Sequence, residues 1–310
     1  MDLLAVLGEE WTPGTLIAER FGVSRQAVLR VAKRLATLGY PVERSRRGYR
    51  LAPGSPSPAN VEPKLRGRFG RPYRYLPAVS STQDALRELA EAGAPEGAVV
   101  VAERQTAGRG RRGRRWESPG GGLYLSVLLR PRIPLERLPL VPLAAGVAVA
   151  RAAGVGGLKW PNDLVALVGG SWRKLGGVLL EAEILGEELK YVLLGVGLNV
   201  AEEELPEGAA GLRRFFPEAR RDELLVRVLA ELERAYPLLS DPDHLLELYA
   251  LHSATLLRRV EARWLSGPVS GVAVGLDAGG ALLVRQPGGR RKRVTAGEVS
   301  LVEATKEVGR

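Results

Sequence analysis

The sequence contains no cysteine, only two histidines and a single methionine. Without a thiol, the chain can form no disulfide, no thiolate metal site and no cysteine nucleophile. The histidines, His244 and His252, stand eight residues apart near predicted helices, and two isolated imidazoles do not make a metal site. We therefore interpret both histidines as structural residues and expect the chemistry to rest on other side chains.

Long hydrophobic runs are also missing, because no apolar stretch approaches the roughly 20 residues that cross a bilayer. The opening MDLLAVLGEEW is flanked by acids and has no basic region, unlike a secretory signal peptide. We expect a cytoplasmic protein with no membrane partner. The chain has 310 residues, 45% of them hydrophobic and 26% charged, which is enough for two or three domains with real cores.

Lysine is scarce and arginine abundant, with 7 lysines against 38 arginines. The formal net charge of +10 indicates an acidic partner or substrate. The charge is concentrated, since residues 104–115 hold six arginines and residues 44–50 hold four, and neither stretch contains an acid. Because lysine is rare here, each lysine within a motif deserves separate attention.

Proline divides the chain at residues 52–63, where four prolines stand within twelve residues. Such a density excludes a helix and favours an extended linker. We therefore expect a domain over residues 1–51, the linker over 52–63, a central domain over 64–260 and a C-terminal domain over 261–310.

The first domain has the pattern of a winged helix-turn-helix. We expect helices over Leu3–Leu7 and Thr15–Phe21, and a third helix that Ser24 caps and that ends near Leu38. Val42–Leu51 follows as a predicted β-hairpin wing with arginines at its tip.

DNA binding follows from this geometry, because a recognition helix puts its first turn against base edges and wing arginines contact phosphates. The candidate DNA-binding residues are Ser24, Arg25, Gln26, Arg30, Arg46 and Arg47. A small helical domain with a solvated basic face is the alternative interpretation, and the basic wing favours DNA binding.

The remaining chain mixes strands and helices. Strands are expected at Ala98–Glu103, Leu123–Leu129, Leu164–Val168, Gly177–Ile184 and Leu189–Val196, and helices at Pro142–Ala153, Arg221–Leu239 and Pro242–Leu251. Because the strands come in adjacent groups, we expect an α+β fold with a mixed sheet rather than a doubly wound one. Three short strands, Val269–Leu276, Ala281–Gln286 and Lys292–Ala296, then predict a small β-barrel.

The strongest chemical signal is the arginine-rich segment Glu103–Trp116, which follows a predicted strand. Its glycines let the backbone approach an anion, and its arginines can neutralise phosphates or a carboxylate. The segment lacks the Gly-Lys-Ser/Thr ending of a P-loop. A flexible nucleic-acid-binding tail is the alternative, which the flanking strands disfavour.

Two lysine motifs accompany it. In Leu158–Leu164, Pro161 forces a turn that presents Asn162 and Asp163, and Asp163 could ligate Mg²⁺ together with phosphate oxygens. The alternative is a plain surface turn.

The second motif, Lys174-Leu-Gly-Gly, leads into a strand whose glycines make room for a ligand. Here the alternative is a glycine hairpin with a chance lysine. Further on, Gly195-Val-Gly-Leu-Asn199 ends a strand with an amide that could read a purine edge.

These motifs, in this order, resemble those of the biotin protein ligase family. The N-terminal domain makes the chain similar to the bifunctional form, which is both a ligase and a biotin operon repressor. Gly275–Leu283 and Gly297–Leu301 resemble the family's SH3-like C-terminal barrel. The resemblance covers nearly the whole chain and implies a central domain of the class II synthetase-like, mixed-sheet type.

The resemblance also implies roles for single residues. Biotin would be bound by Ser81, Thr82, Gln105, Gly108, Arg109, Arg111, Lys174 and Gly177, and ATP by Arg111, Arg114, Trp116, Lys159, Asn162 and Asn199. Arg111, Lys159 and Lys174 would be catalytic, and Asp163 would bind Mg²⁺ as the cofactor. Gln83 replaces the family's usual asparagine, which leaves its role open. The long stretch between the two lysines predicts a lengthened hairpin over Val168–Ser171.

By this resemblance the protein activates biotin with ATP to biotinyl-5′-AMP and transfers biotin to a lysine of the biotin carboxyl carrier protein of a biotin-dependent carboxylase. A homodimer would repress biotin genes by binding operator DNA. Three alternatives remain: a lipoate ligase, a non-enzymatic biotin-sensing regulator, and a ligase whose N-terminal domain no longer represses. The arginine-rich segment and both lysines argue against the first two.

Overall fold

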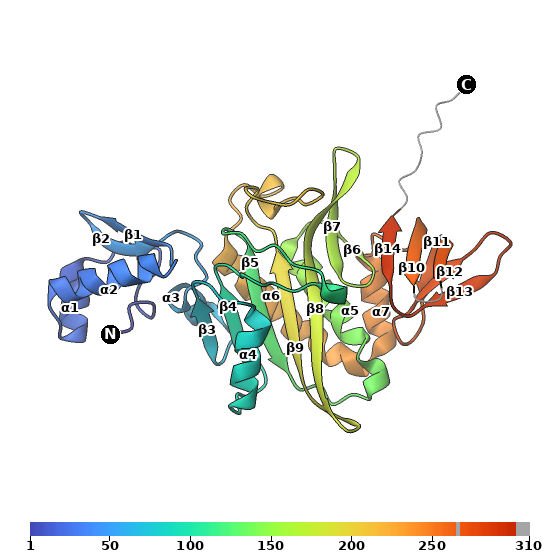
Figure 1. Ribbon diagram of the computed structural model, residues 1–310, viewed down its shortest axis with the longest axis horizontal. Coiled ribbons are helices and arrows are strands. Elements are labelled where there is room, and N and C mark those ends of the chain that lie inside the picture. Colours follow the sequence, from blue (N-terminus) through green and yellow to red (C-terminus); the bar gives the residue numbers. More distant parts are fainter. Residues whose placement is uncertain (265–266, 302–310) are drawn as a thin grey trace.

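The computed structural model describes residues 1–264 and 267–301, arranged as an N-terminal head, a central sheet with helices and a smaller C-terminal sheet (Figure 1). The last nine residues of the predicted C-terminal domain, 302–310, lie outside the described residues. None of the described helices is long and apolar enough to cross a membrane.

The head (residues 1–51) contains helices α1 (Gly14–Phe21) and α2 (Arg25–Thr37) and the hairpin of β1 (Val42–Ser45) with β2 (Gly48–Leu51). As predicted, Ser24 caps α2, its Oγ accepting a hydrogen bond from the backbone N–H of Ala27 at 3.2 Å. The winged helix-turn-helix pattern is thereby confirmed.

The predicted helix at Leu3–Leu7 is wrong, because these residues form a turn closed by a 2.8 Å hydrogen bond from the Leu7 N–H to the Leu3 carbonyl. Five residues offer too few internal hydrogen bonds to offset the cost of nucleating a helix. Both leucines are instead buried in the core of the head.

The linker expectation also needs correction, because a short helix, α3 (Pro58–Val61), and a 3₁₀ turn, η1 (Glu62–Lys64), lie within this region. Pro58 occupies the first helical position, where a missing N–H costs nothing. Ser57 and Val61 are buried, so this part of the chain packs against its neighbours and is not a free tether.

The central sheet has seven strands in the order β3-β4-β5-β9-β8-β7-β6. Their bounds are β3 (Tyr73–Leu76), β4 (Val99–Ala102), β5 (Leu123–Leu129), β6 (Gly157–Lys159), β7 (Asp163–Val168), β8 (Ser171–Leu185) and β9 (Glu188–Leu198). Only β3 and β4 are parallel, so the sheet is mixed, as expected. The predicted hairpin at Val168–Ser171 is confirmed, since these two residues are register partners.

Helix α4 (Thr82–Glu91), which the sequence analysis does not predict, packs on one face of this sheet. The other face carries α5 (Leu140–Ala153), α6 (Arg221–Ala235) and α7 (Pro242–Leu251) (Figure 1). Short 3₁₀ turns complete the region: η2 (Arg111–Gly113), η3 (Leu135–Arg137), η4 (Leu212–Arg214) and η5 (Tyr236–Ser240). The predicted helix Arg221–Leu239 is α6 followed by η5, because Pro237 has no N–H to continue it.

The two faces of the sheet differ because successive strand residues point to opposite sides. Leu125, Val127 and Val196 lie in the core cluster that also contains the buried residues of α5 and α6. Their neighbours Ser126 and Gly195 are register partners on the opposite face. That face therefore offers small residues where the other offers branched hydrophobic ones.

The C-terminal sheet is antiparallel, with strands β10 (Arg259–Trp264), β11 (Gly267–Leu276), β12 (Leu282–Arg285), β13 (Arg291–Val294) and β14 (Glu298–Leu301). The order β13-β12-β11-β10-β14 places β13 and β14 at opposite edges. The described strands thus form an open five-stranded sheet, and the SH3-like barrel stays a prediction.

Candidate active site

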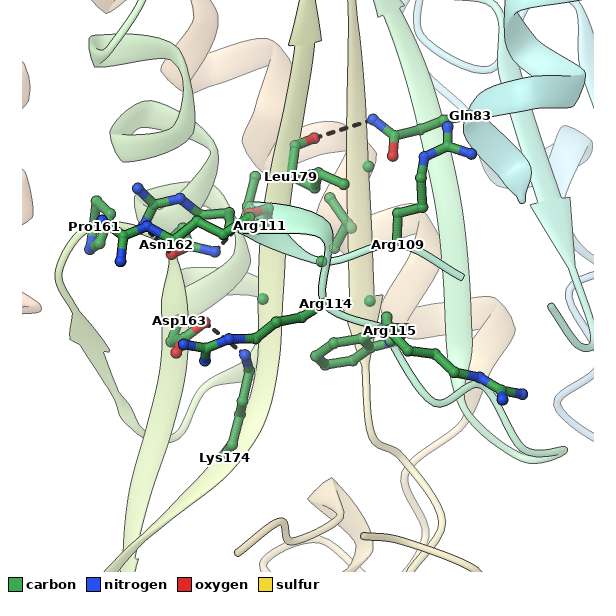
Figure 2. Close-up of a pocket in the computed structure, with 18 of the residues that line it drawn as sticks. Gln83, Arg109, Arg111, Arg114, Arg115, Pro161, Asn162, Asp163, Lys174 and Leu179 are labelled. Carbon is green, nitrogen blue, oxygen red and sulfur yellow. Dashed lines mark hydrogen bonds and ion pairs between the residues drawn. The ribbon is translucent and has the colours of Figure 1, made fainter. Parts of the chain in front are cut away.

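A cleft of about 940 Å³, partly open to solvent, lies on the small-residue face of the central sheet. It is lined by the start of α4, the loop between β4 and β5, the turn between β6 and β7, strands β8 and β9, and the start of β14 (Figure 2). The cleft thus combines segments more than 200 residues apart in sequence.

Glycines form the floor of this cleft. Gly177 of β8 and Gly197 of β9 are register partners. A Cβ atom on Gly197 would lie 2.7 Å from the Trp116 ring. On Gly195, a Cβ atom would lie 3.1 Å from the Gln83 side chain. The floor therefore has to be glycine for these two side chains to lie against the sheet.

The arginine loop (residues 103–122), between β4 and β5, folds into a small hairpin and is not a tail. The Gly110 N–H donates to the Arg114 carbonyl at 2.8 Å, and the Trp116 N–H donates to the Gly108 carbonyl at 2.9 Å. Arg112 adopts a left-handed conformation at the tip, with φ 58°. The loop thus keeps its hairpin shape through its own backbone hydrogen bonds.

Arg111 reaches from this loop across the cleft. Its Nη1 donates to Asn162 Oδ1 at 3.1 Å and to the Gly297 carbonyl at 3.3 Å. Burial lowers the pKa of Arg111, partly offset by the nearby Asp163 carboxylate. A guanidinium stays protonated at neutral pH even so. Arg111 is therefore a fixed, partly desolvated positive charge facing the cleft.

Two other arginines of the loop have carboxylate partners. Arg109 Nε donates to Glu181 at 2.8 Å, and its Nη1 lies 2.7 Å from Asp84. Arg114 pairs with Glu298 of β14 through both guanidinium nitrogens, one at 2.8 Å. These hydrogen bonds raise the pKa of both arginines. They fasten the loop to α4, β8 and the C-terminal sheet.

Both motif lysines surround one carboxylate, as Figure 2 shows for Lys174 and Asp163. Lys174 Nζ lies 2.7 Å from Asp163 Oδ1, and Lys159 Nζ lies 3.8 Å from Asp163 Oδ2. Lys174 Nζ is also 5.1 Å from the centre of the Trp116 ring. Because β7 pairs with both β6 and β8, the sheet register brings these motifs together.

The polar end of the cleft is a network of neutral groups. Gln105 Oε1 accepts from the Thr82 N–H at 2.8 Å, and Gln105 Nε2 donates to Ser118 Oγ at 2.9 Å. Thr82 Oγ1 and Ser126 Oγ are 2.8 Å apart. Ser81 caps α4, its Oγ accepting from the N–H of residue 83 at 3.2 Å. Such hydroxyl and amide groups can bind a neutral polar ring.

Gln83, whose role the sequence leaves open, ties α4 to the sheet. Its Nε2 donates to the Leu193 carbonyl at 3.1 Å and to the Leu179 carbonyl at 3.4 Å (Figure 2). The side chain lines the cleft but is engaged with the backbone. It therefore positions the start of α4.

Not every predicted site residue lines the cleft. Asn199 is buried beside it, where its Nδ2 donates to the Lys174 carbonyl at 3.1 Å. This contact favours a positioning role over direct recognition of a purine. Gly108 also lies outside the lining. A Cβ atom added at this position would lie 2.5 Å from the Trp116 carbonyl oxygen. All other predicted ligand-binding residues line the cleft.

Glu298, Glu181 and Asp84 belong to the site and are missed by the sequence analysis. Each is an acid that neutralises an arginine of the loop. The only sequence signal for Glu298 was its place in the C-terminal segment Gly297–Leu301. No spacing rule predicts a pairing across such distances in the chain.

A magnesium ion needs oxygen ligands, which acids near the cleft would have to supply. Within residues 1–264 and 267–301, no group of three or more acids or histidines could hold a metal ion by itself. Asp163 lines the cleft, and Mg²⁺ commonly uses one or two carboxylates plus phosphate oxygens and water. The residues present thus fit a magnesium ion that arrives with a phosphate ligand.

A second groove lies in the head between α2 and the wing. It is lined by several predicted DNA-binding residues, namely Arg25, Gln26, Arg46 and Arg47. The Arg47 guanidinium also lies 5.0 Å from the centre of the Trp11 ring. Ser24 and Arg30 are outside this lining, and Ser24 acts as the helix cap.

Comparison with protein families and known proteins agrees with this organisation. Residues 75–199 match the biotin/lipoate A/B protein ligase family, residues 258–302 the biotin protein ligase C-terminal domain and residues 2–50 an HTH domain. The bifunctional ligase/repressor BirA of Bacillus subtilis is 37% identical to this chain, covering 96% of each. The BirA of Escherichia coli is 31% identical, covering 99% of this chain and 98% of that protein.

A solved structure shows the same fold. The biotin protein ligase from Aquifex aeolicus, in complex with biotin and ATP, superimposes with a TM-score of 0.62. It is 31% identical in sequence and covers 74% of this chain and 98% of its own. The two ligase family matches, residues 75–199 and 258–302, contain every residue that lines the cleft.

Proposed function

The chain belongs to the biotin protein ligase family, and from this premise we propose that it activates biotin with ATP and attaches the biotinyl group to a lysine of a carrier protein. The observation that carries the proposal is the cleft itself. Arg111, Lys159 and Lys174 converge there over a glycine floor, beside a neutral hydrogen-bonding pocket.

The first step joins two anions. A carboxylate oxygen of biotin attacks the α-phosphorus of ATP. The bond between the α-phosphorus and the oxygen that bridges it to the β-phosphate breaks, and pyrophosphate leaves. Biotin is already ionised at neutral pH, so this step needs no general base. The obstacle is charge repulsion and the charge that develops on the α-phosphate. Three fixed cations in a partly desolvated cleft lower that barrier electrostatically.

Each substrate has a region of the cleft that suits it. Ser81, Thr82 and Gln105 offer hydroxyl and amide groups for the ureido ring of biotin. Gly177 leaves space for the ligand beside the strand.

The phosphates of ATP fit Arg111, Arg114 and Lys159, with Asn162 beside them and Trp116 as the flat surface for adenine. Asp163 would hold Mg²⁺, which neutralises phosphate charge when bound. In this assignment Arg114 exchanges Glu298 for phosphate when ATP binds.

In the second step the amine of the acceptor lysine attacks the acyl carbon of biotinyl-5′-AMP, and AMP leaves. The adenylate is a mixed anhydride that water would destroy, so it must be shielded until the acceptor arrives. Arg109, Gly108 and the rest of the arginine loop cover the cleft at this point. The acceptor is the biotin carboxyl carrier protein of a biotin-dependent carboxylase.

The proposal is tested by incubating the purified protein with biotin, ATP and Mg²⁺ and looking for biotinyl-5′-AMP by mass spectrometry. We expect the adenylate, and biotin on the carrier lysine once carrier is added. Lipoate in place of biotin should give no adenylate. Biotin binding without adenylate would overturn the ligase assignment in favour of a biotin-sensing regulator.

The adenine surface gives a prediction of its own. Gly197→Ala should raise the KM for ATP about tenfold, because the new Cβ displaces the Trp116 ring by overpacking. Steady-state kinetics with varied ATP would measure it. Gly275→Ala, at a position where a Cβ meets nothing within 4 Å, is the matched control. An unchanged KM in the first variant would remove Trp116 from the ATP site.

The head supports a second function, repression of biotin genes by binding operator DNA. The supporting observation is the arginine-lined groove between α2 and the wing. Two-fold symmetric operators are bound by dimers, so we propose a homodimer as the DNA-binding form. Because ATP and operator DNA are both cytoplasmic, we place the protein in that compartment.

Arg46→Ala should weaken binding to operator and random DNA alike and reduce the salt dependence by about one unit in the slope of log K against log salt. Titrations at several salt concentrations measure this slope. Arg20→Ala, an exposed arginine of α1 outside the groove, should leave the slope unchanged. Equal slopes for the wild type, Arg46→Ala and Arg20→Ala would contradict the proposal that the wing contacts phosphates.

A further inference from the structure

The arginine loop begins and ends on one buried cluster of side chains. Glu103, its first residue, directly follows β4 and is only 6% exposed. Gly122, its last residue, directly precedes β5. Both ends meet the side chain of Arg221, which starts helix α6 on the far side of the sheet from the cleft.

Arg221 Nη1 joins the two ends. It donates to Glu103 Oε2 at 2.7 Å and to the Gly122 carbonyl at 3.4 Å. The other carboxylate oxygen of Glu103 accepts from the Tyr75 hydroxyl. Tyr124, beside the same cluster, donates its hydroxyl to the Pro119 carbonyl at 2.8 Å. Four polar side chains thus hold the base of the loop.

The charges in this cluster are well compensated. Burial alone would lower the pKa of Arg221, but the Glu103 carboxylate outweighs that effect and raises the pKa above its usual value. A buried pair of this kind adds little net stability over a hydrophobic pair but fixes geometry strictly. Its value to the protein therefore lies in where it holds the backbone.

Glu103 lies two residues before Gln105, whose amide contacts Thr82 in the neutral pocket. Only Arg104 separates the two residues, so the backbone carries a displacement of one to the other. Any shift of Glu103 therefore displaces Gln105 and changes the path of the loop that follows. We propose that Arg221 and Glu103 are positioning residues that clamp both ends of the arginine loop and so set its fit over the ligand.

The first turn of α6 contains its own control. Arg220 precedes Arg221 but pairs with Glu9 of the head and, at 3.1 Å, with Asp222. Arg220 has no contact with Glu103 or with the loop among the contacts that the described residues make. A variant of Arg220 disturbs the same helix end while leaving the clamp intact.

The measurements with biotin rest on the proposed ligase function. The test therefore includes a measurement that needs no ligand, the rate at which trypsin cleaves the loop. Trypsin cleaves after arginine, and the loop carries six of them over residues 104–115. Arg221→Lys keeps the charge but replaces the rigid guanidinium, whose Nη1 makes both contacts, with a strongly hydrated ammonium on a flexible stem. Arg221→Gln combined with Glu103→Gln removes both charges together and leaves no buried unpaired charge.

For both variants we expect trypsin to cut the loop about tenfold faster, with the biotin KM and the release rate of biotinyl-5′-AMP rising by a similar factor. kcat at saturating biotin should fall less. A purely structural role would lower the folded fraction and the apparent kcat while leaving KM unchanged. Thermal unfolding confirms that the variants are folded.

Arg220→Gln should match the wild type in the rate of trypsin cleavage, the biotin KM and the release rate of biotinyl-5′-AMP. The proposal is overturned if trypsin cuts the loop of Arg221→Lys and of the double variant at the wild-type rate. It is also overturned if Arg220→Gln raises the cleavage rate of the loop as much as they do. If the wild type makes no biotinyl-5′-AMP, the proposed function fails, while the trypsin rates still decide whether Arg221 clamps the loop.

Discussion

Replacing Lys174 by alanine is expected to slow the formation of biotinyl-5′-AMP about 100- to 1,000-fold, the usual cost of removing one fixed electrostatic group from an active site. Lys174 Nζ lies 2.7 Å from Asp163 and 5.1 Å from the centre of the Trp116 ring. In the proposed function, this charge would face the acyl phosphate as it forms. Single-turnover measurement of the adenylate at saturating substrates would isolate this step.

The lysine variant should still bind biotin, because the neutral pocket of Thr82 and Gln105 remains. Lys190→Ala, an exposed lysine of β9 on the same sheet but away from the cleft, is the matched control and should keep the wild-type rate. A Lys174→Ala protein that is folded, binds biotin and adenylates it at more than a tenth of the wild-type rate would exclude Lys174 from catalysis.

The second large effect is expected for Arg111→Ala, which should reduce kcat/KM for adenylation about 100-fold. Arg111 is the arginine of the loop that contacts both the turn after β6 and the backbone of Gly297, just before β14. Its removal takes away a charge and also releases the loop from the far side of the cleft. Both the rate and the biotin KM should therefore change.

Arg111→Lys should recover only part of this loss, because a strongly hydrated ammonium on a flexible stem replaces the rigid guanidinium whose Nη1 contacts both partners. Arg104→Ala provides the control, since Arg104 is on the same loop but is exposed and outside the cleft lining. Steady-state kinetics with varied biotin would measure all three. Equal losses for Arg104→Ala and Arg111→Ala would show that general loop charge, not this contact, matters.

Local chemistry explains why many elements were predictable. Ser24 caps α2 as expected from its side chain, and short apolar runs predicted β5 and β7. The motif around Lys159 and the glycine-rich start of β8 were recognisable because their residue types are unusual at that spacing. Contacts between residues close in sequence depend on few other choices of the chain.

Long-range packing explains what was missed. The helix predicted at Leu3–Leu7 is a turn, because five residues are too few to nucleate a helix, and the proline-rich region contains α3, whose Ser57 cap and Val61 are buried against the rest of the chain. Helix α4 was not predicted although Ser81 is a good cap. The contact of the Asn199 amide with the Lys174 carbonyl was not predicted either, and its role toward the nucleotide stays a prediction.

The sequence by itself determined the kinds of group available: arginines on a glycine-rich loop, two rare lysines, one central aspartate and a basic head. Only the tertiary structure decided which of them meet. The register of β6, β7 and β8 brings Lys159, Asp163 and Lys174 together, and β14 brings Glu298 to the loop. The reason is physical, because pairing between distant segments is chosen by the packing of the whole chain and leaves no local signature.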